Sequence, residues 1–548
     1  MWRVPHLFAK NVAGNALVWL TGTTAGAGFL FFGYDQGLLG SLITLDRFLE
    51  TFPKCRDPDV SGITVAIYEV GCAIGAFLSI CYGDRMGRKQ TIMLGMTLIC
   101  VGAVIMTSSY SLAQLIVGRI ITGLGNGFNT ATVPTLLSEL APPQIRGALN
   151  LIAGALVATG IAVAYSIALG FYFVPSSVAW RIPLLGQVFF AVPVMMLLLC
   201  IPESPSWLVK HADKHPSYLP EAKETFRKIY NLESPEDEYV LALVEATEVT
   251  VAQVTKFSYR DLLTGGPTQH LRRVLIAGAT QFTQQLTGVN LISYFLFEGV
   301  GLSPLKARIM AVGNGWAYSL CGFLFIRFVD THGRRSTMLW GTFVNGVCMV
   351  CLTALVYQSD RGNQACGNAA IAFLFLYNAG FAWGWLGQGW LYPSEITPLA
   401  IRIPANGIST ICNWLINFMG AVLSLFRARF PLTIALFMIC PPAFDSIGAF
   451  TYLIFGVLCL LFIIPVLYIW FPETKQRSLE EMVHLIFAEV YNDKDGKLGG
   501  YVKHSFNRPR ISGRELDLAL QKELGGGKGD LDHLEKADSE ELSSPALK

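Results

Sequence analysis

Twelve long runs of apolar residues divide most of this chain, and they constrain its fold more than any other feature. A helix needs about 20 predominantly apolar residues to cross the hydrocarbon core of a bilayer. Backbone polar groups in that core are satisfied only within helices or closed barrels. We therefore predict an all-α membrane protein with twelve transmembrane helices. The runs are 16–39, 62–83, 91–106, 112–135, 147–173, 182–201, 274–296, 305–328, 337–357, 369–392, 404–425 and 449–471.

Composition supports a lipid-facing surface. The 548 residues are 52% hydrophobic and only 15% charged, whereas soluble domains have about 25% charged residues. The net charge of +2 gives no basic field that would attract nucleic acid. Of the 12 cysteines, most lie in apolar runs, where a thiol behaves as a small hydrophobe. Cys55 and Cys366 lie in polar loops, where they could form a disulfide, although the sequence does not favour this pairing.

Basic residues are concentrated in loops on one side of the predicted bundle. Cytoplasmic loops carry an excess of Lys and Arg, so we expect this side, with both termini, to face the cytoplasm. The loop after the first run, on the opposite side, is also basic in part. The cytoplasmic set includes Arg85, Arg88 and Lys89 in the second loop, Arg334 and Arg335 in the eighth, and nine further Lys and Arg between the sixth and seventh runs.

The order of the runs suggests five segments. We expect a cytoplasmic N-terminus (1–15), a six-helix bundle (16–201), a cytoplasmic linker (202–273), a second six-helix bundle (274–471) and a cytoplasmic tail (472–548). Short helices are expected in the linker at 221–230 and 236–248. The tail is charged and rich in glycine, which is typical of disorder.

The two halves carry the same short motifs after corresponding apolar runs, in the same order. Gly83–Lys89 corresponds to Asp330–Arg335, Ser138-Glu139 to Ser394-Glu395, and Pro202-Glu203-Ser204 to Pro472-Glu473-Thr474. One basic turn alone would be only a topology signal, but three matched pairs indicate a parallel repeat. Transporters built this way bind solute near the midplane, and their halves rock around the site.

Charged residues at the cytoplasmic ends of the helices can form ion pairs that hold this side closed and break on opening. We interpret nine of them as a cytoplasmic gate: Arg88, Glu139, Arg146, Glu203, Arg334, Arg335, Glu395, Arg402 and Glu473.

These motifs resemble the sugar porter family of the major facilitator superfamily, over about Phe32 to Lys475. The marks are Gly-Arg-Lys at 87–89, Gly-Arg-Arg at 333–335, Pro-Glu-Ser-Pro at 202–205, Gln284–Asn290 and Pro472–Lys475. Phe32–Gly37, Tyr68–Cys72 and Ile121–Phe128 resemble the fungal branch, which includes hexose carriers and glycerol/proton symporters. The resemblance implies the major facilitator fold and transport of a sugar or polyol.

Asp35 is an acidic residue in the first apolar run. A charge at the bilayer centre costs about 2.5–3.5 kcal/mol, so such residues are functional by default. Arg119 in the fourth run is its expected partner. A static pair that fixes packing is one alternative; the other is a proton switch loaded and released as the two helices move. The resemblance favours the switch, because proton-coupled sugar porters have Asp at this place. Glu69 is a second intramembrane acid whose role stays open.

Amide side chains in the seventh run, Gln284, Gln285 and Asn290, match the donor and acceptor pattern of vicinal hydroxyls. Amides that join helices are the competing interpretation. Five residues turn a helix by about 140°, so Gln285 and Asn290 converge only if the helix loosens near Gly288. Asn413, with Asn417, adds donors and acceptors, and the resemblance makes Trp390 a site tryptophan.

Three departures from the family pattern weaken the case for a typical hexose. Gly154 replaces a fifth-helix glutamine, and Tyr318 replaces an eighth-helix asparagine. Leu386–Gly389 replaces a Gly-Pro-rich break in the tenth helix. Gln388 could compensate in part, and Gln187 is a lesser candidate for solute contact.

We therefore expect a secondary active transporter of a sugar or polyol, driven by proton symport. The alternatives are a passive facilitator and a nutrient receptor that does not transport. The chain has no phosphate-binding Gly-Lys-Ser/Thr loop, and its eight histidines lack metal-ligand spacing. We accordingly expect no enzyme activity, cofactor or metal. The expected partners are the solute, a proton and the lipid bilayer, with a monomer in the plasma membrane.

Overall fold

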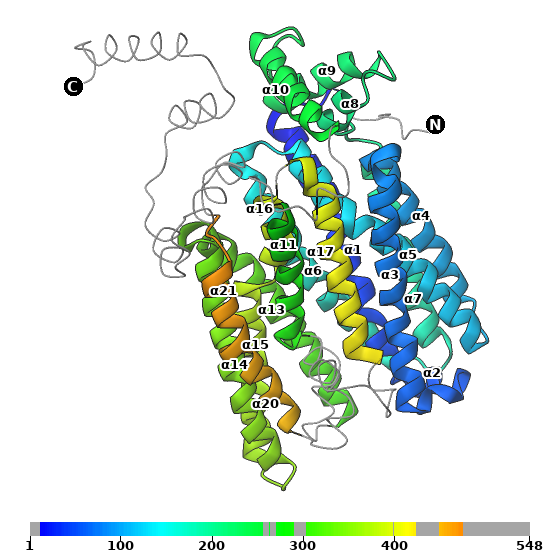
Figure 1. Cartoon of the computed structure of the whole chain (residues 1–548). Helices are drawn as coiled ribbons and strands as arrows, with labels where there is room; N and C mark the ends of the chain where they lie inside the picture. The colour runs from blue at the N-terminus through cyan, green and yellow to red at the C-terminus, as the bar shows by residue number, and fades with distance from the viewer. Residues whose placement is uncertain are drawn as a thin grey trace.

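The computed structural model describes residues 11–255, 262, 270–289, 303–397, 399–422 and 449–474. In these ranges the regular elements are helices (Figure 1). The prediction of an all-α protein is therefore confirmed.

The N-terminal bundle contains six long helices. They are α1 (Gly14–Leu42), α3 (Pro58–Met86), α4 (Arg88–Thr107), α5 (Leu112–Leu140), α6 (Pro143–Tyr172) and α7 (Val178–Leu198). Two short helices, α2 (Asp46–Thr51) and η1 (Pro53–Arg56), connect α1 to α3.

The C-terminal bundle supplies the other six positions, two of which are built from more than one helix. Its elements are α11 (His270–Leu286), α13 (Pro304–His332), α14 (Arg334–Ser359), α15 (Gln364–Gly384), α16 (Gln388–Ile396), α17 (Leu399–Val422), α20 (Phe450–Val457), the π-helical η3 (Leu458–Ile463) and α21 (Ile464–Trp470). Helices thus lie at all twelve positions that the apolar runs predict. The tenth run is interrupted at its Leu386–Gly389 segment, where α15 gives way to α16.

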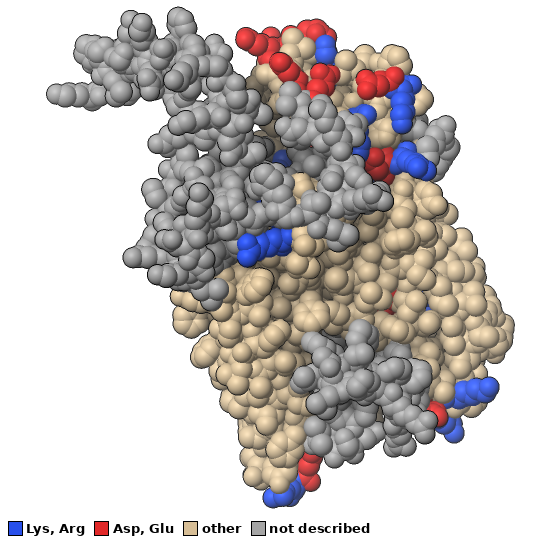
Figure 2. All heavy atoms as spheres, in the orientation of Figure 1, with Lys and Arg blue, Asp and Glu red and all other residues tan. Residues whose placement is uncertain are grey.

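Nine helices within the described ranges are long and apolar enough to cross a membrane. Their outward surfaces carry large apolar side chains such as Phe189, Leu324 and Leu461, which water would not tolerate as a continuous surface. In the described part of the face in Figure 2, charged side chains gather toward the two ends and leave a band with little visible charge between them. The chain is a multi-pass membrane protein.

The linker forms a small helical layer over one end of the bundles, here called the linker end (Figure 1). It contains α8 (Pro205–Lys210), α9 (Tyr218–Tyr230) and α10 (Glu238–Thr255). Trp207, Leu208, Phe226 and Val240 make its apolar core. The expected helices at 221–230 and 236–248 are largely confirmed as α9 and α10. Because α9 contacts α1 and α10 contacts α17, the linker touches both bundles.

The two bundles meet along α6 with α13 and along α3 with α17. Small hydroxyl groups join α6 to α13: the Thr159 and Ser319 hydroxyls are 2.7 Å apart, and Trp316 Nε1 donates to Ser166 Oγ at 3.1 Å. Farther from the linker end, Arg308 of α13 donates to the carbonyl oxygen of Ser41, which lies near the end of α1.

Cys55 and Cys366 are both free thiols, so the disulfide that the sequence left open is not formed in this structure.

Backbone contact between α1 and α6 requires glycine. A Cβ atom at Gly160 would lie 2.0 Å from the carbonyl oxygen of Leu30, and one at Gly33 would lie 2.0 Å from that of Val157. Small residues let membrane helices approach closely, where van der Waals packing replaces the hydrophobic effect.

We predict that Gly160→Ala forces α1 and α6 apart and lowers stability by about 1–3 kcal/mol, the usual range for overpacking. The measurement is the thermal unfolding temperature of the detergent-purified protein. Gly170→Ala in the same helix is the matched control, because a Cβ there meets no atom within 4 Å. Equal unfolding temperatures for the two variants would contradict this packing argument.

Candidate transport site

Asp35 lies in the middle of the N-terminal bundle and is completely buried, with 0% exposure. Its Oδ1 accepts hydrogen bonds from Gln187 Nε2 of α7 at 2.7 Å and from Arg119 Nη1 of α5 at 3.4 Å. Its Oδ2 is buried with no hydrogen-bond partner. The sequence predicted the pairing with Arg119, and the structure brings the two residues together. Gln187, a lesser candidate for solute contact, binds Asp35 in this structure.

The Arg119 guanidinium is held by α3 as well as by Asp35. Nη2 donates to the carbonyl oxygen of Val65 at 3.3 Å, and the guanidinium carbon lies 4.4 Å from the centre of the Tyr68 ring. A cation over an aromatic face is attracted by the ring quadrupole. Four helices, α1, α3, α5 and α7, therefore meet at one buried charge pair. The contact between Arg119 and Tyr68 has no signature in helical spacing, although Tyr68 begins the Tyr68–Cys72 motif that resembles the fungal branch.

The glutamines of α11 make three different contacts. Gln285 Nε2 donates to Asn413 Oδ1 of α17 at 2.5 Å, so these two predicted solute residues lie together. Gln284 Nε2 instead donates to the carbonyl oxygen of Trp385 at 2.9 Å, and Gln281 Nε2 to that of Gly389 at 2.8 Å. In this conformation Gln284 and Gln281 brace the break between α15 and α16, a role that helical spacing does not reveal.

The backbone of the seventh run leaves the regular α-helical path near Gly288. The helix ends at Leu286, and Gly288 has φ 89°, in the left-handed region that favours glycine. A Cβ at Gly288 would also lie 2.7 Å from Met349 Cε. Asn290, the third predicted amide, lies outside the described residues.

Aromatic side chains cross from one bundle to the other near the middle of the molecule. Trp390 makes edge contacts with Phe29 and Phe32 of α1, with ring centres 6.0 and 5.9 Å apart. Trp414 contacts Phe32 at 5.5 Å and Tyr68 at 6.0 Å in the same way. The Trp390 position predicted from the resemblance thus lies at the interface between the bundles.

The departures from the family pattern have a steric basis at one position. A Cβ at Gly154 would lie 2.8 Å from the Cα of Gly387, so α6 and the α15–α16 break touch backbone to backbone and leave no room for a glutamine. Tyr318 is buried, with its ring 6.2 Å from that of Phe381. Gln388 donates to Thr337 Oγ1 at 3.1 Å and to the Trp383 carbonyl oxygen at 2.9 Å.

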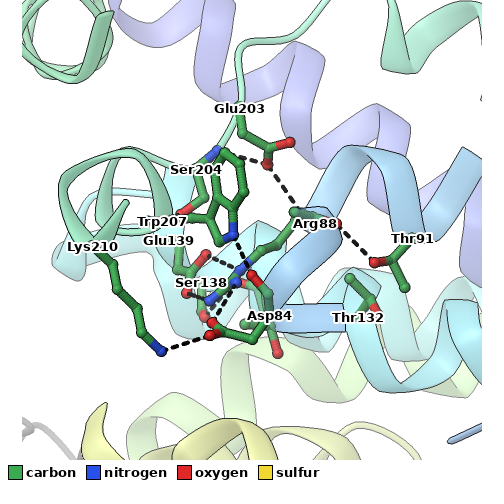
Figure 3. Close-up of polar contacts among 12 residues, drawn as sticks. Asp84, Arg88, Thr91, Thr132, Ser138, Glu139, Glu203, Ser204, Trp207 and Lys210 are labelled. Carbon is green, nitrogen blue, oxygen red and sulfur yellow. Dashed lines mark hydrogen bonds and ion pairs between the residues drawn. The ribbon is translucent and has the colours of Figure 1, made fainter. Parts of the chain in front are cut away.

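Figure 3 shows the ion-pair network at the linker end of the N-terminal bundle. Arg88 Nε donates to Glu139 Oε2 at 3.0 Å, and Arg88 Nη1 lies 3.5 Å from Asp84 Oδ1. Lys210 of α8 donates to Asp84 Oδ2 at 2.8 Å, and Trp207 Nε1 donates to the Asp84 carbonyl oxygen at 2.7 Å. The linker is therefore tied to the same carboxylate as the gate arginine.

The C-terminal bundle repeats this arrangement. Arg334 Nη2 donates to Glu395 Oε1 at 3.2 Å, and Thr474 Oγ1 donates to Glu395 Oε2 at 2.6 Å. Arg335 donates to the carbonyl oxygen of Tyr468. The Arg88–Glu139 and Arg334–Glu395 pairs each join helices of a single bundle.

Other predicted gate residues bind backbone groups. Glu203 accepts hydrogen bonds from the backbone N–H groups of Arg88 and Lys89, both at 3.2 Å. Glu473 accepts from the backbone N–H groups of Arg334 and Arg335, at 2.8 and 3.1 Å. Each glutamate thus caps the first turn of α4 or α14, where free N–H groups and the helix dipole favour a negative charge.

The remaining two gate arginines, Arg146 and Arg402, contact the carbonyl oxygens of Ala141 and Thr397, each at 3.4 Å. At Glu203, burial raises the pKa of the carboxyl, while the Ser204 backbone N–H and the Lys89 and Arg88 charges act in the opposite direction.

A model of the family described as "Sugar (and other) transporter" matches residues 20–485. This chain belongs to the sugar transporter family of the major facilitator superfamily. That family consists of transporters, so the protein is not an enzyme.

Curated relatives of this sugar transporter agree with the assignment. It is 34% identical to the MFS-type transporter oryC of Aspergillus oryzae, over 82% of each chain. It is also 34% identical to the sugar transporter STL1 of Saccharomyces cerevisiae, over 88% of this chain and 83% of that protein.

Solved structures share the fold. The proton:xylose symporter XylE bound to 6-bromo-6-deoxy-D-glucose gives a TM-score of 0.73 at 23% identity, over 86% of this chain and 99% of that one. XylE from E. coli in an inward-open conformation gives a TM-score of 0.63 at 23% identity, over 85% of this chain and 99% of that one.

We predict that Arg88→Ala destabilises the protein by about 3–5 kcal/mol, because it leaves the Glu139 charge buried and uncompensated. Side-chain exposure is 6% for each residue. Glu139→Ala should cost less, because Arg88 keeps Asp84 as a partner, and the double variant should unfold at nearly the temperature of Arg88→Ala. Additive losses in a double-mutant cycle measured by thermal unfolding would show that the two residues act independently.

Proposed function

We propose that this sugar transporter carries a sugar or polyol together with a proton by alternating access. In this proposal the linker end faces the cytoplasm, as do both termini, and the protein works as a monomer in the plasma membrane. The supporting observation is the environment of Asp35. This carboxylate is wholly buried, shares one oxygen between Arg119 and Gln187, and leaves the other oxygen without a partner.

The unpartnered Oδ2 of Asp35 is a position where a proton can bind without displacing Gln187 from Oδ1. Protonation removes the negative charge that attracts Arg119, and this attraction is strong in a low-dielectric interior. Arg119 is also bound to Val65 and Tyr68 of α3. Neutral Asp35 therefore frees α1 to move relative to α3 and α5, which couples protonation to helix movement.

On the solute side, the amides of Gln285 and Asn413 supply donors and acceptors from two helices of the C-terminal bundle. A solute with vicinal hydroxyls can replace the hydrogen bond between them with bonds to itself, because hydroxyls also donate and accept. Trp390 offers an apolar face to the C–H side of the solute. Gln284 holds the break beside this site, and Asn290 completes the proposed set.

Alternating access then requires the linker end to open. The segments 16–201 and 274–471 would move as two bundles along the α6–α13 and α3–α17 interfaces. The gate pairs Arg88–Glu139 and Arg334–Glu395 connect helix ends within each bundle, and the glutamate caps Glu203 and Glu473 keep α4 and α14 anchored as the bundles move. Such a change is a rigid-body rearrangement between two packed states.

We predict that Asp35→Asn abolishes uphill accumulation of solute and retains solute exchange, because an amide cannot carry the coupling proton. The measurement is uptake and counterflow of glycerol, D-glucose, D-xylose and xylitol in proteoliposomes, with and without a proton gradient. Thr24→Val is the control on α1, since the Thr24 hydroxyl is already bonded to the Leu20 carbonyl oxygen of its own helix. Accumulation by Asp35→Asn equal to wild type would refute Asp35 as the proton-coupling residue. A wild-type protein that equilibrates solute but never accumulates it would be a passive facilitator.

We predict that Gln285→Ala raises KM for every carried solute by about tenfold or more, corresponding to about 1.4 kcal/mol, because one amide is lost and Asn413 loses its partner. Concentration-dependent uptake gives KM. Thr283→Val in the same helix is the control, as its hydroxyl bonds to the Ala279 carbonyl oxygen at 2.7 Å. Unchanged uptake in Gln285→Ala refutes the proposed site.

A further inference from the structure

Glu69 is a buried acid that the proposed proton switch does not use. It lies in α3 with 4% exposure, and its Oε2 has no hydrogen-bond partner. A buried carboxyl oxygen without a hydrogen bond is unfavourable in any apolar interior, and an acid in a membrane helix indicates a functional role. The question is which group completes its hydrogen bonding.

Helix geometry places Glu69 on the face of α3 that meets α17 of the other bundle. Eleven residues of an α-helix rotate by about three full turns plus 20°, so Glu69 and Ile80 share one face. Ile80 packs against α17: a Cβ at Gly407 would lie 2.2 Å from Ile80 Cγ1. Tyr68, the neighbour of Glu69, contacts Trp414 of α17. Glu69 therefore lies at the interface between the bundles, near the level of Trp414.

Other polar atoms around this interface also lack partners. Trp414 is fully buried, and its Nε1 donates to no acceptor. Asn126 of α5 bonds through Nδ2 to Cys72 Sγ, one turn along α3 from Glu69, and leaves its buried Oδ1 unpartnered. The unpartnered acceptors belong to the N-terminal bundle, and the unpartnered donor belongs to the C-terminal bundle. They lie close to the proposed Gln285–Asn413 amide pair, because Asn413 directly precedes Trp414 in the chain.

We propose that Glu69 is the solute-binding carboxyl of the N-terminal bundle and accepts hydrogen bonds from two adjacent hydroxyls of a sugar or polyol. This inference rests on the proposed function and deepens it. A carboxyl group offers two oxygens on one plane, and adjacent hydroxyls can bond to both of them because hydroxyls donate and accept. Trp414 Nε1 supplies a donor to a hydroxyl oxygen of the same solute. Gln285 and Asn413 bind the solute from the opposite bundle.

This arrangement assigns different tasks to the two intramembrane acids. Asp35 already has Arg119 and Gln187 as partners within its own bundle, so its hydrogen bonding changes through protonation and helix movement. Glu69 faces the other bundle, and its missing partner arrives with the solute. Solutes without a vicinal diol leave its carboxyl unsatisfied and are therefore bound weakly.

The test compares KM in proteoliposomes for wild type and Glu69→Gln, using solutes that differ by one hydroxyl. The probes are glycerol with 1,2-propanediol and 1,3-propanediol, and D-glucose with its 2-deoxy, 3-deoxy and 6-deoxy forms. We expect Glu69→Gln to raise KM for the parent solute by about 3- to 10-fold, the effect of losing one hydrogen bond. For the analogue that lacks the contacted hydroxyl, wild type and variant should have equal KM.

Thr64→Val on the same helix is the matched control, because the Thr64 hydroxyl bonds to the Val60 carbonyl oxygen and should not affect KM. Loss of accumulation with unchanged KM in Glu69→Gln would make Glu69 a proton carrier and overturn the proposal. An equal change in KM for parent and all deoxy solutes, with a lower unfolding temperature, would show a structural role and also overturn it. Absence of flux by the wild-type protein with every probe would contradict the proposed function itself.

Discussion

The buried contact between Asp35 and Arg119 is the interaction on which the N-terminal bundle depends. It joins α1 to α5 directly, and the further contacts of Arg119 and Asp35 extend it to α3 and α7. In a membrane, no water is available to solvate either charge, so each must be satisfied by neighbouring helices. The position of four helices relative to one another is thus tied to the charge state of one carboxyl. A change in that charge is the simplest input that can alter their packing.

The linker end depends on a second kind of electrostatic contact, which is present twice. Gly87 and Gly333 adopt φ of 96° and 93°, and each precedes a helix whose first N–H groups are bound by a glutamate from the end of its own bundle. In both bundles the basic motif therefore begins a helix, and the Pro-Glu motif caps it. The shared geometry gives a structural reason for the repeated motifs, because the basic motif begins the helix and the Pro-Glu motif caps its first turn.

The sequence was sufficient for the positions of the helices and for the Asp35–Arg119 pair. Apolar run length determines where a chain can span a membrane, and two opposite charges in apolar runs have few alternatives to each other. The sequence was not sufficient to predict the contacts of Gln284, Glu203 or Glu473, because these side chains bind backbone groups. Every residue presents a backbone N–H or carbonyl, so such a partner has no signature in the side chains. The sequence also did not predict the bond from Gln187 to Asp35, because an amide suits a solute and a carboxylate equally well.

The hydroxyl contacts between α6 and α13 have a consequence for movement between the bundles. Thr159 is within hydrogen-bond distance of the carbonyl oxygen of Ala155 as well as of Ser319, and Ser166 donates to that of Ala162 while accepting from Trp316. Each α6 hydroxyl thus keeps an acceptor in its own helix when its cross-bundle contact breaks. When the bundles slide, the α6 hydroxyls therefore stay bonded within α6, and only Trp316 and Ser319 of α13 lose their cross-bundle partners. The polar cost of movement along this interface falls on α13 alone.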